Sequence, residues 1–166
     1  MQIANGRLLW TNGITGVTIL ENGVGWRGFH HVAVVTRDLE ETARFYGDVL
    51  GMSVGETIDN DAQGAVSRHR FVQPGGDESW GLHFFESPEA EAHPSARRID
   101  RGALMGTVGV QHVAFALPDE TAGVALRERL RENGVESTEI GSAGPIRNTL
   151  FFDNNGLLLE ATWPRP

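Results

Sequence analysis

The sequence contains no cysteine among its 166 residues, which excludes disulfide bonds and thiolate metal sites. It also lacks an apolar run of the roughly 20 residues that a membrane-spanning helix needs, and its first residues lack the basic and apolar regions of a signal peptide. Basic residues are scarce: 14 Lys and Arg face 22 Asp and Glu, for a formal net charge of −8. Nucleic-acid binding needs a basic face, so we expect no nucleic-acid partner. The missing membrane span and signal peptide lead us to expect a cytoplasmic protein that does not bind a membrane.

Glycine, by contrast, is abundant, and its 21 residues indicate many tight turns. One short pattern occurs twice: residues 31–38 and 112–119 both begin His-Val-Ala and end in Asp. Apolar residues at helical spacing follow each copy. The two copies are about half the chain apart, which is too far for a solenoid repeat. We therefore infer that a strand–helix module was duplicated.

Residues 1–28 are expected to form a β-meander ahead of the first module. Asn-Gly pairs at 5–6, 12–13 and 22–23 separate short apolar runs, and such pairs are the strongest short-range signal for a hairpin. We expect this extension to cover a sheet edge or to contact a second copy, and not to carry chemistry.

Residues 29–86 are expected to form a βαβββ module. Its helix should begin after Asp38, which suits an N-cap because Glu41 follows three residues later. Gly51 suits the left-handed residue that ends the helix. The strands are expected over residues 29–35, 51–58, 65–72 and 79–85.

Residues 87–108 read as a linker, and residues 109–163 as a second βαβββ module. The arginine-rich patch at 97–101 is interpreted as a solvated face, with a lid over an anionic substrate as the alternative. The second helix should span 119–133 and close at Gly134. The strands are expected over 110–117, 135–140, 149–152 and 157–162, with a loop over 141–148 and a tail over 163–166.

The two repeated histidines lie on strand faces with small neighbours. Side chains alternate along a strand, so His31 shares its face with Ala33. Likewise, His112 shares its face with Ala114 and Ala116. These small residues leave room above the sheet for a ligand. His30 is the alternative to His31, but both the alternation and the repeat favour His31.

Two further polar residues, His83 and Glu160, fall in the closing strands of their modules. Glu160 lies in an apolar strand, where a buried carboxylate is costly without a partner. A metal ion, an arginine such as Arg147, or exposure at a sheet edge would each resolve that cost. Each residue alone is most simply structural, but their correspondence across the repeat indicates one site. Nitrogen and oxygen ligands suit a divalent ion of Fe, Mn, Ni, Co or Zn.

Residues 29–52 (FHHVAVVTRDLEETARFYGDVLGM) resemble the opening of the vicinal oxygen chelate superfamily. This group includes glyoxalase I, methylmalonyl-CoA epimerase, fosfomycin-resistance and bleomycin-resistance proteins, and extradiol dioxygenases. Residues 111–115 and 152–160 resemble its second-module motifs. The resemblance implies a single α+β domain over 29–163, in which two tandem βαβββ modules form a U-shaped mixed sheet around one divalent metal.

The resemblance also implies which residues bind that metal. His31, His112 and Glu160 fall at the metal-ligand positions of the superfamily. His83 falls where glyoxalase-type members place a fourth ligand. On this basis we expect a glyoxalase- or epimerase-like lyase or isomerase that acts on a small molecule with neighbouring oxygens. Glu160 and His83 are its expected catalytic residues.

Two alternative functions remain open. An Fe(II) extradiol dioxygenase needs two histidines and one carboxylate, but ring-cleaving relatives carry a catalytic Tyr where this chain has Leu150. His69 or His83 would then serve as acid or base. A metal-free binding protein of the bleomycin-resistance kind is disfavoured, because that role needs no metal ligands.

Substrate contacts and assembly are predicted less directly. Arginine side chains can receive a carboxylate or a phosphate. Each module exposes one sheet face, so we expect a homodimer, in which modules are either kept or exchanged between chains. The candidate substrate contacts are Arg68, His69, Arg70 and Arg147.

Overall fold

The structure is a computed structural model that describes residues 2–4, 7–9, 29–62, 65–75, 81–91 and 109–166. At the N-terminus, strands β1 (Gln2–Ala4) and β2 (Arg7–Leu9) pair antiparallel, as the Asn-Gly pair between them predicts. The rest of the expected meander and the arginine-rich patch at 97–101 lie outside the described residues. Among the described residues, no helix is long and apolar enough to cross a membrane.

The first module forms a five-stranded sheet. Its order is β3-β7-β6-β4, and β5 also pairs with β6. β3 and β7 run parallel, whereas β4 and β5 pair antiparallel with successive parts of β6, so that together they act as one interrupted strand. The strands are β3 (His31–Thr36), β4 (Ser53–Val54), β5 (Ile58–Ala62), β6 (Ala65–Gln73) and β7 (Gly81–Glu86).

Helix α1 (Leu39–Arg44) begins where the sequence predicts. The Asp38 carboxylate accepts hydrogen bonds from the backbone N–H groups of Glu40 and Glu41, so it satisfies donors that the first turn leaves open. These bonds lower the pKa of Asp38. The helix continues as the π-helical turn η1 (Phe45–Val49), and the chain then turns at Gly51, whose φ of 74° favours glycine.

The second module repeats the order with a four-stranded sheet, β8-β11-β10-β9. Its helix α3 (Glu120–Glu132) has Asp119 as N-cap and is followed by Gly134 at φ 71°, as expected. β8 runs parallel to β11, and β10 pairs antiparallel with both β11 and β9. The strands are β8 (Val113–Ala116), β9 (Gly141–Ala143), β10 (Ile146–Phe152) and β11 (Leu158–Pro164).

Several boundaries in this module were predicted wrongly: β8 begins at Val113 and not at 110, and β10 begins at Ile146 and not at 149. The strand expected over 135–140 contributes only one isolated bridge, from Ser137 to Phe151, and β9 lies instead in the expected loop. A tight turn at Gly144 (φ 60°) lets β9 fold back onto β10. The expected tail begins inside β11, because Trp163 is buried against α3 at Gly123.

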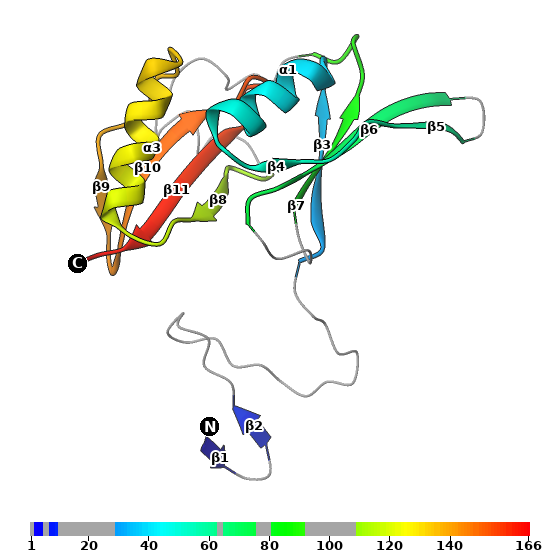
Figure 1. Cartoon of the computed structure of the whole chain (residues 1–166). Helices are drawn as coiled ribbons and strands as arrows, with labels where there is room; N and C mark the ends of the chain where they lie inside the picture. The colour runs from blue at the N-terminus through cyan, green and yellow to red at the C-terminus, as the bar shows by residue number, and fades with distance from the viewer. Residues whose placement is uncertain (1, 5–6, 10–28, 63–64, 76–80, 92–108) are drawn as a thin grey trace.

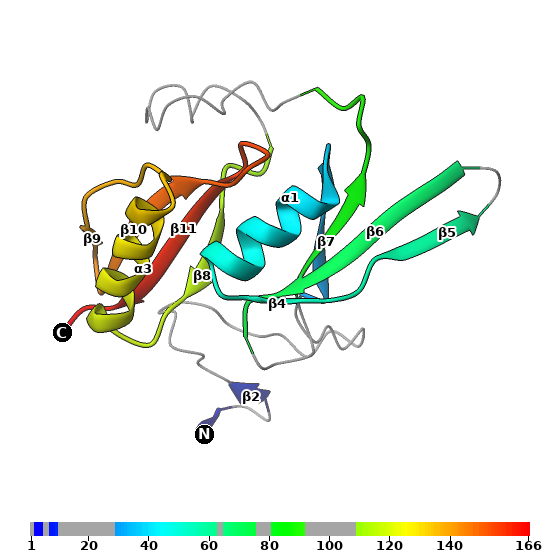
Figure 2. The same ribbon diagram turned by 45° about the horizontal axis from the view of Figure 1, so that its top comes forward.

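The helices of both modules share one apolar core with the inner faces of the two sheets. α1 lies between the two sheets in both views (Figures 1 and 2), while α3 packs on β10 and β11. Burial alternates along β8, where Val113 and Phe115 are buried and Ala114 and Ala116 are exposed. The opposite sheet faces, which carry the repeated histidines, are therefore turned away from the core.

Candidate metal centre

The second module brings His112 and Glu160 together. Glu160 in β11 pairs with Ala114 in the parallel strand β8, so the two residues share a face, and His112 precedes Ala114 by two positions. His112 Nε2 lies 2.8 Å from Glu160 Oε2. Glu160 is only 8% exposed, although it sits on the outer face of the sheet. The predicted neighbourhood of these two residues is therefore present in the structure.

Asn148 is a third member of this group that the sequence did not reveal. Its Nδ2 donates to Glu160 Oε1 at 2.7 Å. Leu150 in β10 pairs with Glu160, and alternation puts Asn148 on the same face. The sequence could have indicated this position, because Asn148 is two residues from Leu150 and so lies on the same face of the strand. The carboxylate thus has one oxygen fixed by an amide and the other directed at an imidazole.

The first module brings together three histidines on its outer face. His83 in β7 lies beside Ala33 in β3, and the His31 and His83 ring centroids are 5.5 Å apart. His83 Nε2 is 2.7 Å from His69 Nδ1. Burial, together with the charges of His69 and His31, lowers the pKa of His83. The Phe71 ring stacks on His83 with a centroid distance of 3.9 Å.

The three arginines predicted as substrate contacts lie on the opposite faces. Arg68 alternates with His69 along β6 and pairs with Glu86 at 2.7 Å. Arg70 pairs with Glu40 of α1 at 3.4 Å. Arg147 alternates with Asn148 along β10 and pairs with Glu120 at 3.0 Å, so it is not the partner of Glu160. Of the four residues predicted as substrate contacts, His69 alone shares the face of the predicted ligands.

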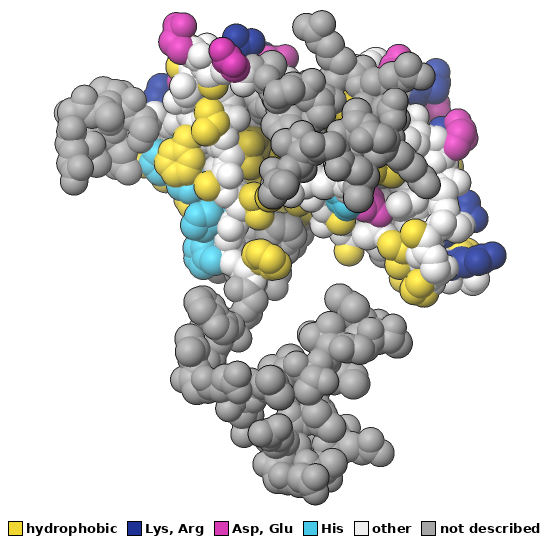
Figure 3. All heavy atoms as spheres, turned by 180° about the vertical axis from the view of Figure 1, so that it is seen from behind, with side chains coloured by type: hydrophobic (Ala, Val, Ile, Leu, Met, Phe, Trp, Pro, Cys, Tyr) yellow, Lys and Arg dark blue, Asp and Glu magenta, His cyan; other side chains and the backbone are white. Residues whose placement is uncertain are grey.

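The four predicted ligands lie in two pairs, one on each sheet. Where the chain is described, no three His, Cys, Asp or Glu side chains are grouped so that they could hold a metal ion. Histidines gather in one group on one part of the face seen from behind, and another histidine lies beside an acidic side chain on a separate part (Figure 3). The prediction that His31, His83, His112 and Glu160 bind one metal therefore remains a prediction.

The chemistry of these residues fits a divalent metal. All candidate donors are imidazole nitrogens and carboxylate oxygens, which suit Fe(II), Mn, Ni, Co and Zn. The almost buried Glu160 carboxylate is contacted by a neutral amide and an imidazole. A bound cation would offset the cost of burying its charge.

Comparison with known proteins identifies relatives of this chain. Over 134 residues the chain is 31% identical to "Putative ring-cleaving dioxygenase MhqE" of Bacillus subtilis, covering 76% of this chain but only 38% of that protein. It is 26% identical to the uncharacterized protein YwkD of the same organism, covering 81% of this chain and 94% of YwkD.

Solved structures share the fold. A glyoxylase/bleomycin resistance protein/dioxygenase domain from Frankia sp. EAN1pec superposes with a TM-score of 0.65 at 21% identity, covering 84% of this chain and 99% of that one. A mutant of the fosfomycin resistance protein FosX of Listeria monocytogenes, in a complex with Mn(II) and a dihydroxypropylphosphonic acid, gives a TM-score of 0.58 at 18% identity, covering 82% of this chain and 91% of that one. The sequence pattern of one family matches residues 28–161. The chain therefore belongs to the glyoxalase/bleomycin resistance protein/dioxygenase superfamily.

Proposed function

We propose that the protein is a divalent-metal-dependent enzyme that acts on a small molecule with two neighbouring oxygen atoms. His31, His112 and Glu160 are its proposed ligands. The observation that carries this proposal is the 2.8 Å approach of His112 Nε2, just before β8, to Glu160 Oε2 in the adjacent strand β11. A nitrogen and an oxygen that converge this closely can both ligate one ion, and the exposed Ala114 and Ala116 leave space beside them.

The proposed reaction is proton transfer of the glyoxalase or epimerase type. A bound metal supplies Lewis-acid polarisation of the substrate oxygens. Glu160 is the residue that takes and returns the proton, since a carboxylate within reach of the substrate is suited to that work. Asn148 holds Glu160 Oε1 at 2.7 Å and so fixes the direction of the carboxylate. Because Leu150 stands where ring-cleaving relatives carry Tyr, proton transfer is the first choice.

A ring-cleaving dioxygenase is the second candidate, and the contact between His69 and His83 favours it. His83 Nε2 is occupied by His69 Nδ1 at 2.7 Å, which supports a role for His83 beside the metal and not on it. Three ligands would then leave positions for both a catechol and O₂. The relative named as a ring-cleaving dioxygenase points the same way, but the chain spans only 38% of its length.

We further propose that two copies of the chain complete each site. The two ligand pairs lie on separate sheets, and a second copy could set its β8 and β11 against β3 and β7 of the first. Exposed apolar side chains border the pairs on both modules, and such surfaces mark contacts with a partner. They are Phe29 at 82% exposed, Val35 at 54%, Ile58 at 42% and Val110 at 70%.

Metal binding is tested first with the purified wild-type protein and two matched variants. Glu160→Gln keeps the size of the side chain and removes its charge, so metal occupancy and the metal-dependent rise in melting temperature should fall sharply. Glu136→Gln makes the same change at an exposed position of the same module and should leave both unchanged. Full occupancy of the Glu160→Gln protein would contradict the ligand assignment.

The reaction is tested with two assays on the same preparation. With Ni or Zn bound, solvent deuterium should exchange into an α-hydroxy ketone or thiohemiacetal without oxygen uptake. In the second assay, the protein is loaded with Fe(II) without air and then given a catechol panel and oxygen. Oxygen uptake with a yellow ring-opened product would reject proton transfer in favour of the second candidate. His83→Ala, run in parallel, shows which outcome depends on that residue.

A further inference from the structure

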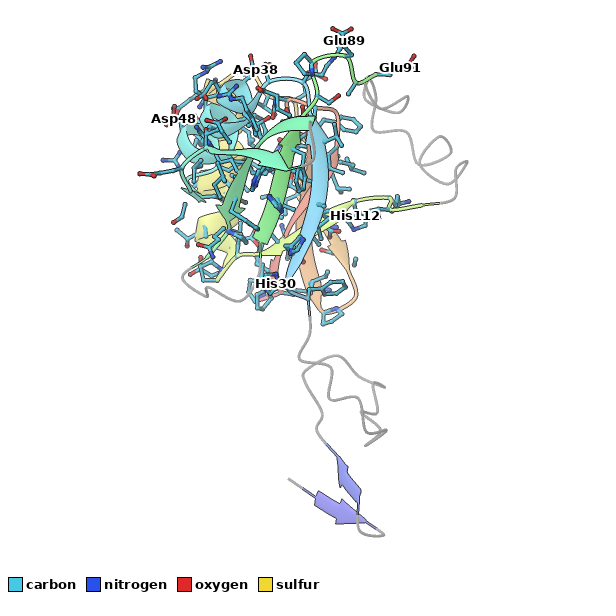
Figure 4. The ribbon with its side chains drawn as sticks, turned by 90° about the vertical axis from the view of Figure 1, so that its right-hand side faces the viewer. His30, Asp38, Asp48, Glu89, Glu91 and His112 are labelled. Carbon is cyan, nitrogen blue, oxygen red and sulfur yellow. The ribbon has the colours of Figure 1, made fainter. Side chains whose placement is uncertain are left out.

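Each repeated histidine is contacted at the same ring nitrogen by the residue that precedes it. Gln111 Oε1 lies 2.9 Å from His112 Nδ1. In the first module, His30 Nδ1 lies 2.8 Å from His31 Nδ1. His30 immediately precedes β3, and His112 immediately precedes β8 (Figure 4). Two unlike side chains thus occupy the same place relative to their histidines in the two halves of the repeat.

The position of this contact decides which nitrogen a histidine offers to a metal. A neutral imidazole carries one proton, and the hydrogen bond made by one nitrogen sets the role of the other. The Gln111 carbonyl oxygen can only accept, so His112 Nδ1 must be the donor. Nε2 then keeps its lone pair, and it faces Glu160 Oε2 at 2.8 Å. A lone pair and a carboxylate oxygen this close repel each other unless a proton or a metal ion lies between them, so this pair of atoms is suited to share a bound metal ion.

In the first module, a different neighbour can leave the Nε2 lone pair of the histidine free. His30 can either donate or accept, so His31 Nδ1 can donate to it and leave His31 Nε2 open, as in the second module. His83 is different, because the neighbouring strand holds it at Nε2 through His69. The shared arrangement is therefore specific to the two histidines of the repeat.

We infer that Gln111 and His30 are positioning residues that fix the ring orientation and tautomer of His112 and His31, so that both present Nε2 to the metal. This inference rests on the proposed metal site. Partners of this kind raise metal affinity because the ligand needs no reorientation on binding, and their loss typically weakens affinity about 10- to 100-fold. His30 and Gln111 are both exposed, so substitutions there should leave the core intact.

The repeat supplies matched variants for a test. Gln111→Leu and His30→Leu remove the hydrogen-bonding group at similar size. Gln111→His and His30→Gln instead install in each module the residue that the other module uses. We expect zinc affinity, measured by competition with a chromophoric chelator, to fall about 10- to 100-fold in the leucine variants. The two exchange variants should bind zinc like the wild type.

A second measurement is independent of metal binding. Long-range proton–nitrogen NMR of the metal-free, ¹⁵N-histidine-labelled protein reports which ring nitrogen carries the proton. The wild type should show protonated Nδ1 at His31 and His112, and the leucine variants should lose this signature at the adjacent histidine. Unchanged nitrogen shifts and unchanged zinc affinity in the leucine variants would overturn the inference. If the wild type binds no zinc, the proposed function fails, and the NMR result alone decides whether the Nδ1 contacts exist.

Discussion

The Tyr46 hydroxyl donates a 2.9 Å hydrogen bond to Asp153 Oδ2, which joins the helical segment of the first module to the β10–β11 turn of the second. Both side chains are buried. Beside this bond, the Thr36 hydroxyl donates to Asn155 Oδ1 at 2.7 Å. Buried polar networks that are fully satisfied favour one arrangement of their parts. These contacts therefore hold the modules of one chain, and the predicted ligand pair on each, in a fixed relation.

Removal of the Tyr46 hydroxyl should weaken the contact between the modules. Tyr46→Phe takes one donor from a buried carboxylate, and a hydrogen bond to a charged group contributes about 1.5 to 3 kcal/mol. We expect a fall of that size in the free energy of unfolding, measured by urea denaturation with Trp fluorescence.

A double-mutant cycle with Asp153→Asn provides the control for this variant. If the hydroxyl acts through Asp153, the loss caused by Tyr46→Phe should be smaller when residue 153 is Asn. Equal losses in both backgrounds would mean that the stabilisation comes from elsewhere in the Tyr46 pocket.

Asp153 also predicts how stability depends on pH. Burial raises its pKa above the ordinary value of 3.8, although hydrogen bonds from Leu157, Tyr46 and Asn155 act in the opposite direction. The folded protein therefore binds this proton more tightly than the unfolded chain does. The resulting stabilisation is fully present below pH 3.8 and is lost as the pH rises through the folded-state pKa.

The measurement compares urea unfolding of the wild type and Asp153→Asn over a series of pH values. The stability of the wild type relative to the variant should decrease as the pH is raised from 3.8. Asp48→Asn removes an exposed carboxylate and corrects for the general effect of one charge. A relative stability that increases with pH would show that the hydrogen bonds outweigh burial.

Much of the candidate site follows from the period of two that the pleat imposes on strands. That period places His31 and His112 on open faces because their neighbours alternate between small and bulky residues, whereas Glu160 stood out as a carboxylate in an otherwise apolar strand. The same reasoning, applied to β6 and β10, would have put Arg68 and Arg147 on the opposite faces. The same period would also have placed Asn148 on the face of Glu160, because Asn148 is two positions from Leu150, which pairs with Glu160.

Other features depend on contacts between distant residues. β9 consists of Gly-Ser-Ala, and none of these residues favours a strand; it forms because β10 offers an open edge. Trp163 precedes Pro164 and reads as the start of a tail, yet α3 buries its ring against Gly123. Where the two predicted ligand pairs lie relative to one another depends on the packing of whole modules, which local patterns do not encode.

The contact between Gly123 and Trp163 predicts the sign of the change in the free energy of unfolding when Gly123 is replaced by Ala. A Cβ on Gly123 would lie 2.5 Å from two carbons of the Trp163 ring. Gly to Ala at a helix position normally stabilises by up to about 1 kcal/mol, whereas overpacking a core costs about 1 to 3 kcal/mol. We expect Gly123→Ala to lower the free energy of unfolding. Ala125→Gly, at an exposed position of α3, measures the propensity effect alone, and a gain from Gly123→Ala would show that the ring can move aside.

Mixed dimers test whether two copies build each metal site. Chains carrying His31→Ala and chains carrying His112→Ala are co-expressed with different affinity tags, and pairs that hold both tags are purified. In an exchanged arrangement, one site of each mixed pair takes both defects. The other site takes the intact His31 of one chain and the intact His112 of its partner. We therefore expect about one metal per mixed pair, half the number in the wild-type dimer.

The two uniform variants provide the controls, since every site in them lacks one histidine wherever the modules meet. If each chain instead folded its modules around its own metal, both chains of the mixed pair would be defective, and metal content would stay at the level of the uniform variants. Light scattering that gives a monomer at all concentrations would reject the two-copy site directly. Metal restored in the mixed pair, with none in either uniform variant, requires that His31 and His112 of one site come from different chains.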